Sequence, residues 1–180
     1  TKAMTVAKNY STKQRPEDFQ SHLLMATAYL WIGNTEKAKE SATTAVQKVA
    51  SANDSVKGLV YCQIGNILND AKEFEMALQN FNQAIAMTNG GDIVKFEANQ
   101  GLGILYYNKA ADYIEAANKV PETDVTGKYE ELLNLSKEQF RLAIPHFTTS
   151  MKMVENDQYR VQQYVTALRA LKTIYARLEM

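Results

Sequence analysis

The sequence is poor in cysteine, proline and glycine, and it carries no net charge. Its 180 residues include one cysteine, three prolines and eight glycines. The single cysteine, Cys62, excludes an intrachain disulfide and leaves the redox compartment open. Twenty basic and twenty acidic residues cancel, so the net charge gives no reason to expect nucleic acid or an anionic membrane surface as a partner. No apolar run reaches the ~20 residues that span a bilayer, so we predict no membrane-spanning helix.

The sequence also lacks the short motifs that carry chemistry. It has no HExxH pair, no CxxC pair and no glycine-rich phosphate loop before a helix. The two histidines, His22 and His146, stand far apart, and neither has a Glu or His at metal-ligand spacing. We therefore predict that the protein is not an enzyme and has no catalytic residues, no cofactor and no metal.

The residues that are present favour helices. Hydrophobic residues make up 46% of the chain and charged residues 22%, which is typical of a globular protein. Apolar residues recur at helical spacing, and Pro16 fits the first position of a helix in which Glu17 and Asp18 follow. The predicted helices cover about residues 16–32, 36–50, 53–69, 73–87, 92–119, 128–156 and 157–180. These seven predicted helices indicate an all-α protein.

The clearest regularity is a helix–turn–helix unit at residues 61–88. Small residues stand where its two helices must touch, and a phenylalanine fills the gap. These residues follow one another at intervals of twelve, four and three: Gly65, Ala77, Phe81 and Ala84. The preceding unit repeats the intervals with Ala26, Ala38, Ala42 and Ala45. Such self-similarity is the mark of a repeat protein, in which each unit buries a face on its neighbour.

The pattern resembles the tetratricopeptide repeat (TPR), an antiparallel helix pair of about 34 residues. The second unit matches with Tyr61, Ile64, Gly65, Leu68, Ala77, Phe81 and Ala84. The first matches with His22, Met25, Ala26, Tyr29, Gly33, Ala38 and Ala45. The usual proline is absent, Leu68 stands in place of tyrosine, and the units are 39 residues apart. The resemblance implies a right-handed α-solenoid of antiparallel helix pairs.

The third unit departs from this spacing. Its first helix has Gly103, but the matching Ala143 comes 40 residues later instead of twelve, with Phe147 after it. The excess of 28 residues adds 14 to each helix if shared equally, or roughly 21 Å of helix. Apolar stripes continue to a break at Val120–Gly127. We therefore predict one long projecting helical hairpin, with Pro145 kinking its second helix or lying near a bend.

The predicted organisation is a single TPR-like domain over residues 1–180. Its parts are a helix remnant and linker (1–15), repeat 1 (19–52), repeat 2 (58–91), an extended repeat 3 (92–156) and the first helix of a truncated repeat 4 (157–180). The last helix carries an apolar stripe at Tyr164, Leu168, Leu171, Tyr175 and Leu178. These features predict a section of a longer array, and the open stripe predicts a homodimer through the terminal helix as one way of covering it.

The extended unit narrows the resemblance. The segments LGILYYNKAADYIEAANKVP, FRLAIPHFTTSMKM and ALKTIYARLEM are similar to TPR proteins of Bacteroidetes-type bacteria. Members of that group commonly look exported, so the resemblance favours the periplasm or the outer-membrane periphery, with the cytoplasm as the alternative.

The resemblance places function on surfaces, above all on the concave groove lined by the first helix of each repeat. The groove positions carried over to this chain are Leu23, Thr27, Leu30, Trp31, Cys62, Asn66, Asn69, Asp70, Gln100, Ile104, Tyr107 and Asn108. Leu23, Trp31 and Ile104 could equally pack between helices. The basic residues that clasp a terminal carboxylate in some relatives are missing, because Leu23, Glu97 and Gly101 stand in their places.

Three functions remain open. The first is a non-enzymatic module that binds a peptide segment or protein subunit in the groove. The second is a structural or assembly subunit of a bacterial envelope complex that acts through the long hairpin. The third is a helical carbohydrate-capture protein. All three leave the identity of the partner undetermined.

Overall fold

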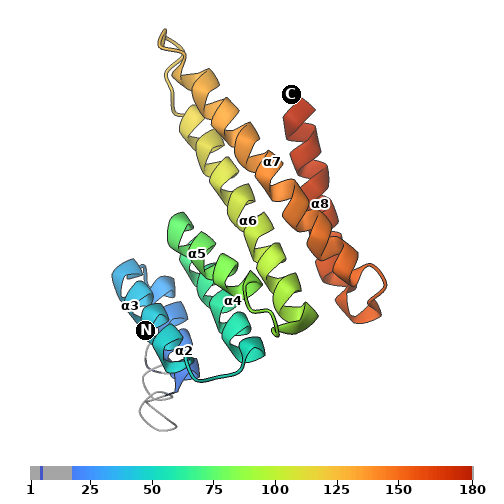
Figure 1. The fold of residues 1–180 in the computed structure, drawn as a ribbon. Coiled ribbons are helices and arrows are strands. Elements are labelled where there is room, and N and C mark those ends of the chain that lie inside the picture. The colour runs from blue at the N-terminus through green and yellow to red at the C-terminus, as the bar shows by residue number, and fades with distance from the viewer. Residues whose placement is uncertain (1–4, 6–17, 180) are drawn as a thin grey trace. The chain divides into compact units, whose positions relative to one another are not determined.

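The computed structural model describes residue 5 and residues 18–179, and every regular element among them is a helix (Figure 1). In chain order these are α2 (Phe19–Trp31), α3 (Thr35–Lys48), α4 (Asp54–Asp70), α5 (Phe74–Ile85), α6 (Gly91–Ala117), α7 (Lys128–Val154), the 3₁₀ turn η1 (Gln158–Arg160) and α8 (Val161–Glu179). The prediction of an all-α fold is confirmed.

The helix ends follow local capping chemistry. Asn53 accepts a hydrogen bond from the Val56 amide at 2.9 Å, as expected for the N-cap of α4. The predicted start of the first helix was wrong, because Asp18 is the N-cap of α2 and not a residue of its first turn. Its carboxylate accepts from the Gln20 amide at 3.3 Å. Pro16 and nearly all of the predicted remnant 1–15 lie outside the described residues.

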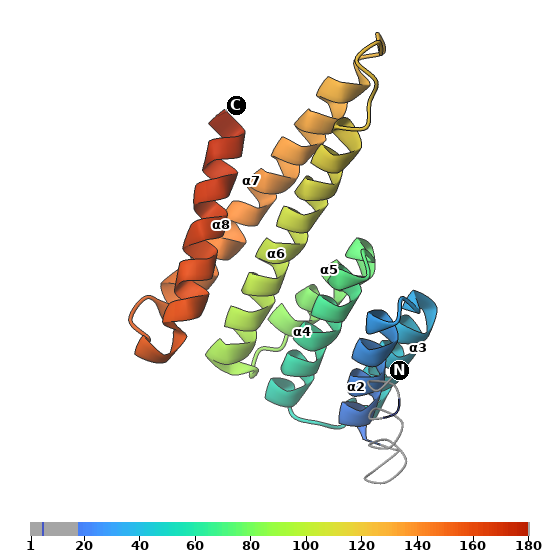
Figure 2. The same cartoon turned by 180° about the vertical axis from the view of Figure 1, so that it is seen from behind.

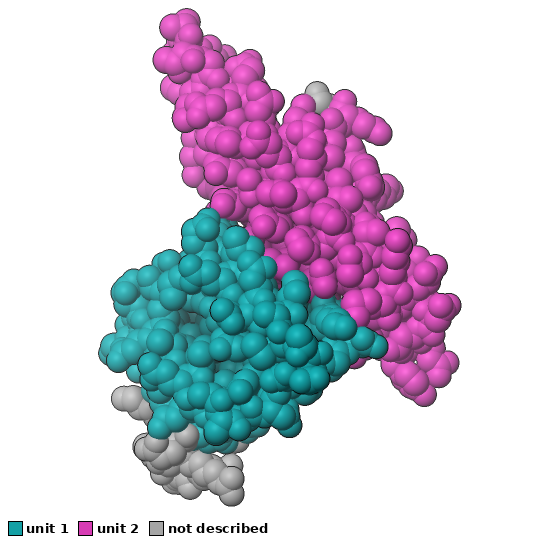
Figure 3. All heavy atoms as spheres, in the orientation of Figure 1, with its two compact units in different colours: residues 1–98 teal, residues 99–180 magenta. Residues whose placement is uncertain are grey.

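The chain divides into two compact units, residues 1–98 and residues 99–180, and α6 crosses the boundary between them (Figure 3). The grouping of all repeats into one domain, with the boundaries given above, stays a prediction.

Unit 1 consists of two antiparallel helix pairs and the first turns of α6. In it α2 packs on α3 and α4 packs on α5, while α4 also contacts α2 and α3. The ring of Phe81 lies so close to Gly65 that a Cβ atom there would come within 2.6 Å of it. Lys39 of α3 forms an ion pair with Glu36 of the same helix at 2.9 Å and one with Glu73, the N-cap of α5, at 2.8 Å. The pair with Glu73 links α3 to the start of α5.

Unit 2 is built on the long hairpin of α6 and α7, which run side by side in both views (Figures 1 and 2). Phe147 lies against Gly103, where a Cβ atom would come within 2.8 Å of its ring. Further along the hairpin Tyr107 meets Phe140 edge to face, with ring centroids 5.5 Å apart. Helix α7 continues unbroken through Pro145, and α8 packs on α7.

We expect Gly65→Ala to destabilise unit 1, although alanine is the better helix former. Alanine in place of glycine gains about 1 kcal/mol of helix propensity, but the added methyl group would overlap the Phe81 ring. Overpacking of this kind costs about 1–3 kcal/mol. Urea unfolding followed by circular dichroism measures the difference.

Adding Phe81→Leu to the Gly65→Ala protein supplies the control, because the smaller side chain leaves room for the methyl group. The double variant should regain part of the loss relative to Gly65→Ala alone. An increase in stability on Gly65→Ala would show that the ring does not hold this close approach.

Candidate interaction groove

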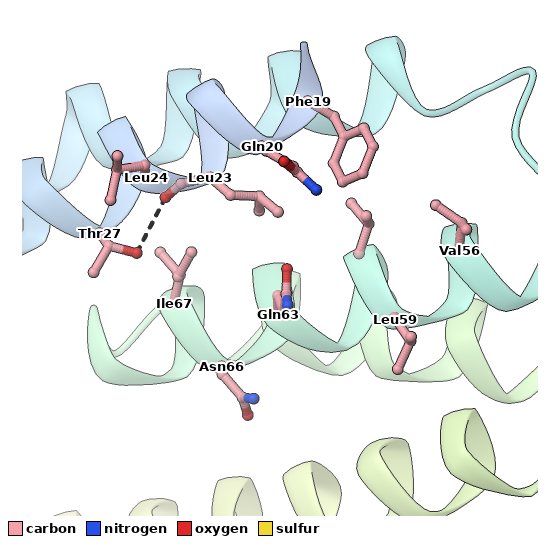
Figure 4. Close-up of a pocket in the computed structure, with 11 residues that line it drawn as sticks. Phe19, Gln20, Leu23, Leu24, Thr27, Val56, Leu59, Gln63, Asn66 and Ile67 are labelled. Atoms are coloured by element: carbon pink, nitrogen blue, oxygen red, sulfur yellow. Dashed lines mark hydrogen bonds between the residues drawn. The ribbon is translucent and has the colours of Figure 1, made fainter. Parts of the chain in front are cut away.

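A groove of about 650 Å³ lies between α2 and α4, entirely within unit 1. It is lined by Phe19, Gln20, Leu23, Leu24, Thr27, Val56, Leu59, Val60, Gln63, Asn66 and Ile67. Figure 4 shows Leu23 and Gln63 pointing into the space between the two helices, with Leu59 and Asn66 on the side of α4 away from α2. The groove therefore has a covered floor and an open side.

The lining follows from helical spacing. On α2, Gln20, Leu24 and Thr27 are four and three residues apart and share one face. On α4, Leu59 and Asn66 are separated by seven residues, or two turns, and likewise share a face. The two helices run in the same direction across the groove (Figure 4), so equivalent positions of the two repeats lie at the same level.

The groove combines an apolar floor with polar groups at its open side. Val60 and Leu23 are buried in the floor. The amide side chains of Gln20, Gln63 and Asn66 are exposed and make no hydrogen bond within the described part of the chain. No lining residue is charged. Each amide can donate and accept, which is what an extended polypeptide backbone requires of a partner.

The structure brings together part of the predicted set. Leu23, Thr27 and Asn66 line the groove, and the Thr27 hydroxyl donates to the Leu23 carbonyl at 3.1 Å. Leu30 is half-buried. Trp31 and Asp70 are exposed at the last positions of α2 and α4.

Two predicted residues of α4 face the interior instead. Cys62 is buried, and its thiol lies 3.8 Å from the Val94 carbonyl oxygen. Burial, with a smaller contribution from the charge of Glu97, raises the pKa of the Cys62 thiol to about 12. Asn69 is also buried. Neither side chain is open to a ligand in the described conformation.

The four predicted residues of α6 belong to unit 2. Ile104 and Tyr107 pack against the buried cluster of the hairpin, while Gln100 and Asn108 are half-buried. Packing between helices, which the sequence left open for Ile104, is what the structure shows for it.

The sequence analysis missed eight of the eleven lining residues: Phe19, Gln20, Leu24, Val56, Leu59, Val60, Gln63 and Ile67. The groove positions were carried over from the family pattern, which singles out only part of each helix face. A helical projection from Thr27 would have added Gln20 and Leu24, and one from Asn66 would have added Gln63, because each lies three, four or seven residues away.

The titratable groups with shifted pKa values do not gather into a reactive site. Burial raises the pKa of Asp70, and burial lowers the pKa of His146, which hydrogen-bonds Asn99 at 3.1 Å in unit 2. Among the described residues no group of His, Cys, Asp and Glu could hold a metal ion. Within the same residues, no helix combines the length and apolar character that crossing a membrane demands.

Among solved structures, the fold is similar to that of a TPR repeats protein from Bacteroides fragilis NCTC 9343. The match has a TM-score of 0.54 and 18% sequence identity, and it covers 93% of this chain and 75% of that one. The likeness shows the fold, and it confirms the predicted TPR-like helical solenoid. No protein-family model and no curated protein matches the chain.

We expect Cys62 to resist alkylation in the folded protein. With its pKa raised from 9.0 to about 12, the reactive thiolate is roughly a thousandfold scarcer than for a free thiol near pH 8. Iodoacetamide labelling followed by mass spectrometry measures the rate, and the same protein in urea serves as control. Equal rates in the two conditions would contradict the buried position.

Proposed function

We propose that the protein is a non-enzymatic interaction module that binds a peptide segment of a protein partner in the groove between α2 and α4. The observation that carries the proposal is the set of three unpaired amide side chains beside an apolar floor. A TPR-like fold is in general a protein-interaction scaffold, which agrees with this reading.

The dimensions suit a short extended segment. Gln20 and Thr27 are seven residues apart on α2, which corresponds to about 10 Å along the helix axis. An extended peptide covers that distance with about three residues. Its apolar side chain would enter the floor at Leu23 and Val60, while its backbone meets the amides.

The other ligand classes find less support in the lining. A groove without charged residues offers nothing to the phosphates of a nucleic acid or to a terminal carboxylate. Carbohydrate capture uses aromatic faces, and Phe19 is the only aromatic residue of the lining. A glycan array without hits would remove that alternative.

We expect Asn66→Ala to weaken capture of a native partner by the full-length protein about fivefold, because one amide that pairs with the peptide backbone is lost. Affinity capture identifies the partner, and titration of its bound segment gives the Kd. Asn66 is exposed and makes no hydrogen bond in the described part of the chain, so the melting temperature should not change.

Gln79→Ala is the matched control, because Gln79 is an exposed amide on α5, outside the groove lining. It should leave binding unchanged. Identical affinities for the Asn66→Ala and Gln79→Ala proteins would count against the groove.

A second candidate function, an assembly subunit of an envelope complex, rests on apolar exposure in unit 2. Val125 at the hairpin tip is 97% exposed, and Tyr129 follows near the start of α7. On α8, Leu168 and Tyr175 are 47% and 50% exposed and share one face at a spacing of seven. Apolar side chains gathered on one face are a feature of protein interfaces.

If α8 forms a homodimer, Leu168→Glu should return the protein to a monomer, since a buried carboxylate without a partner is costly. Light scattering across a concentration series measures the mass. Thr166→Glu, on the exposed polar side of α8, should leave the dimer intact. A wild-type protein that stays monomeric throughout the series would remove the homodimer.

A further inference from the structure

The lining of the groove is apolar at both ends and carries amides between them. Figure 4 shows Phe19 and Val56 on one side of Gln20, and Leu24 and Ile67 on the other side. Each apolar end therefore has one residue from α2 and one from α4. Two separate apolar ends provide places for two apolar side chains of a ligand.

The amides between the ends come from opposite walls. Figure 4 shows Gln20 extending from α2 and Gln63 extending from α4 into the space between the two helices. Both residues are exposed, and neither side chain makes a hydrogen bond within the described part of the chain. Because a primary amide both donates and accepts, each wall offers both kinds of hydrogen-bonding group to whatever lies between them.

An extended polypeptide laid along the groove matches this arrangement. Its side chains alternate between two faces, so every second one faces the floor while the others face solvent. Its backbone N–H and C=O groups point to the two edges between those faces, which are the sides that meet α2 and α4. A helical ligand bonds its backbone groups internally and would leave both amides without a backbone partner.

The distance between the apolar ends sets the spacing of the ligand side chains. Phe19 and Leu24 are five residues apart on α2, and Val56 and Ile67 are eleven residues apart on α4. These intervals correspond to about 8 Å and about 16 Å along the helix axes, with a mean of about 12 Å. In an extended segment, floor-facing residues lie about 7 Å apart at a spacing of two and about 13 Å apart at a spacing of four. The spacing of four fits the groove.

We propose that the groove selects an extended segment with two apolar residues four positions apart, whose backbone passes between Gln20 and Gln63. The two apolar side chains occupy the two apolar ends. The floor-facing residue midway between them is uncharged, because no lining residue carries a charge and a buried charge without a partner is costly. This inference rests on the proposed function and adds the conformation and the side-chain pattern of the bound segment.

The test uses the full chain and a displayed library of random dodecapeptides. We expect the enriched peptides to share two apolar residues four positions apart, with no charge at the position midway. In a synthetic copy of the best peptide, replacing either apolar residue by alanine should weaken binding about tenfold. Gln20→Ala and Gln63→Ala should each weaken binding about fivefold.

N-methylation of the peptide, one bond at a time, tests the backbone contacts. Each methyl group removes one N–H donor. At one or more bonds we expect a loss of about fivefold in the wild-type protein that nearly disappears in Gln20→Ala or in Gln63→Ala, because the amide that meets this N–H is then already missing. A peptide bound as a helix would show the same loss in all three proteins.

Leu24→Ala tests one apolar end. It should weaken binding and make alanine replacement of one of the two apolar peptide residues nearly neutral, while replacement of the other keeps its effect. Leu142→Ala on α7 is the matched control, because Leu142 is exposed to a similar degree, 46% against 37% for Leu24, and lies outside the groove lining. It should leave binding unchanged. Circular dichroism confirms that both variants fold.

Enriched peptides without the four-residue spacing, or with N-methylation losses that are equal in the wild-type, Gln20→Ala and Gln63→Ala proteins, would overturn this inference. If binding of those peptides still falls in Asn66→Ala, the proposed function stands. A library that yields no peptide sensitive to substitutions in the groove lining would overturn both.

Discussion

In the α4–α5 and α6–α7 pairs the two helices meet where an aromatic ring of one occupies the space that a side chain would fill on the other. Phe81 lies against Gly65 in unit 1, and Phe147 lies against Gly103 in unit 2. A contact this close to the backbone fixes the rotation of a helix as well as its distance, because the ring has to meet a position that lacks a side chain. Once Gly65 faces Phe81, Gln63 lies on nearly the opposite side of α4 and points into the space between α2 and α4 (Figure 4).

The same contact explains how the hairpin of unit 2 can be long. Glycine and phenylalanine join α6 and α7 at one point, and the pair then continues through Tyr107 and Phe140. Aromatic pairs with edge-to-face geometry contribute about 0.5–1.5 kcal/mol beyond the area they bury. The buried residues of α8 belong to the same cluster. Their packing therefore also stabilises the long hairpin.

Much of the fold could be predicted from the sequence because the spacing of the small residues indicates which helices pair and how long they are. The twelve-residue interval from Gly65 to Ala77 gives the regular pair, and the 40-residue interval from Gly103 gives the long one. The start of α2 was misplaced because Pro16 and Asp18 both resemble the beginning of a helix, and only the hydrogen bond from Gln20 identifies Asp18 as the cap.

The groove could be predicted only in part, because spacing does not tell which side of a helix is covered. Cys62 and Asn66 are one turn apart on α4, yet Cys62 is buried and Asn66 exposed. Ile104 carries an apolar side chain that suits a groove wall as well as a helix seam, and it packs in the seam. Whether such a side chain is buried depends on the helix that packs over it, and that helix lies far away in sequence.

The residues that determine the fold and those that line the groove therefore lie on different sides of the same helices. The core side of α4 requires small residues and a ring of the right size, a demand that many sequences meet. Its groove side holds exposed polar residues that bear little on stability, since substitutions at exposed positions usually change it by within about 0.5 kcal/mol. Groove chemistry can thus change while the solenoid persists, so a likeness in fold at 18% identity leaves the partner unspecified. The partner has to be inferred from the residues of the groove itself, which are apolar at the floor and amide at the side.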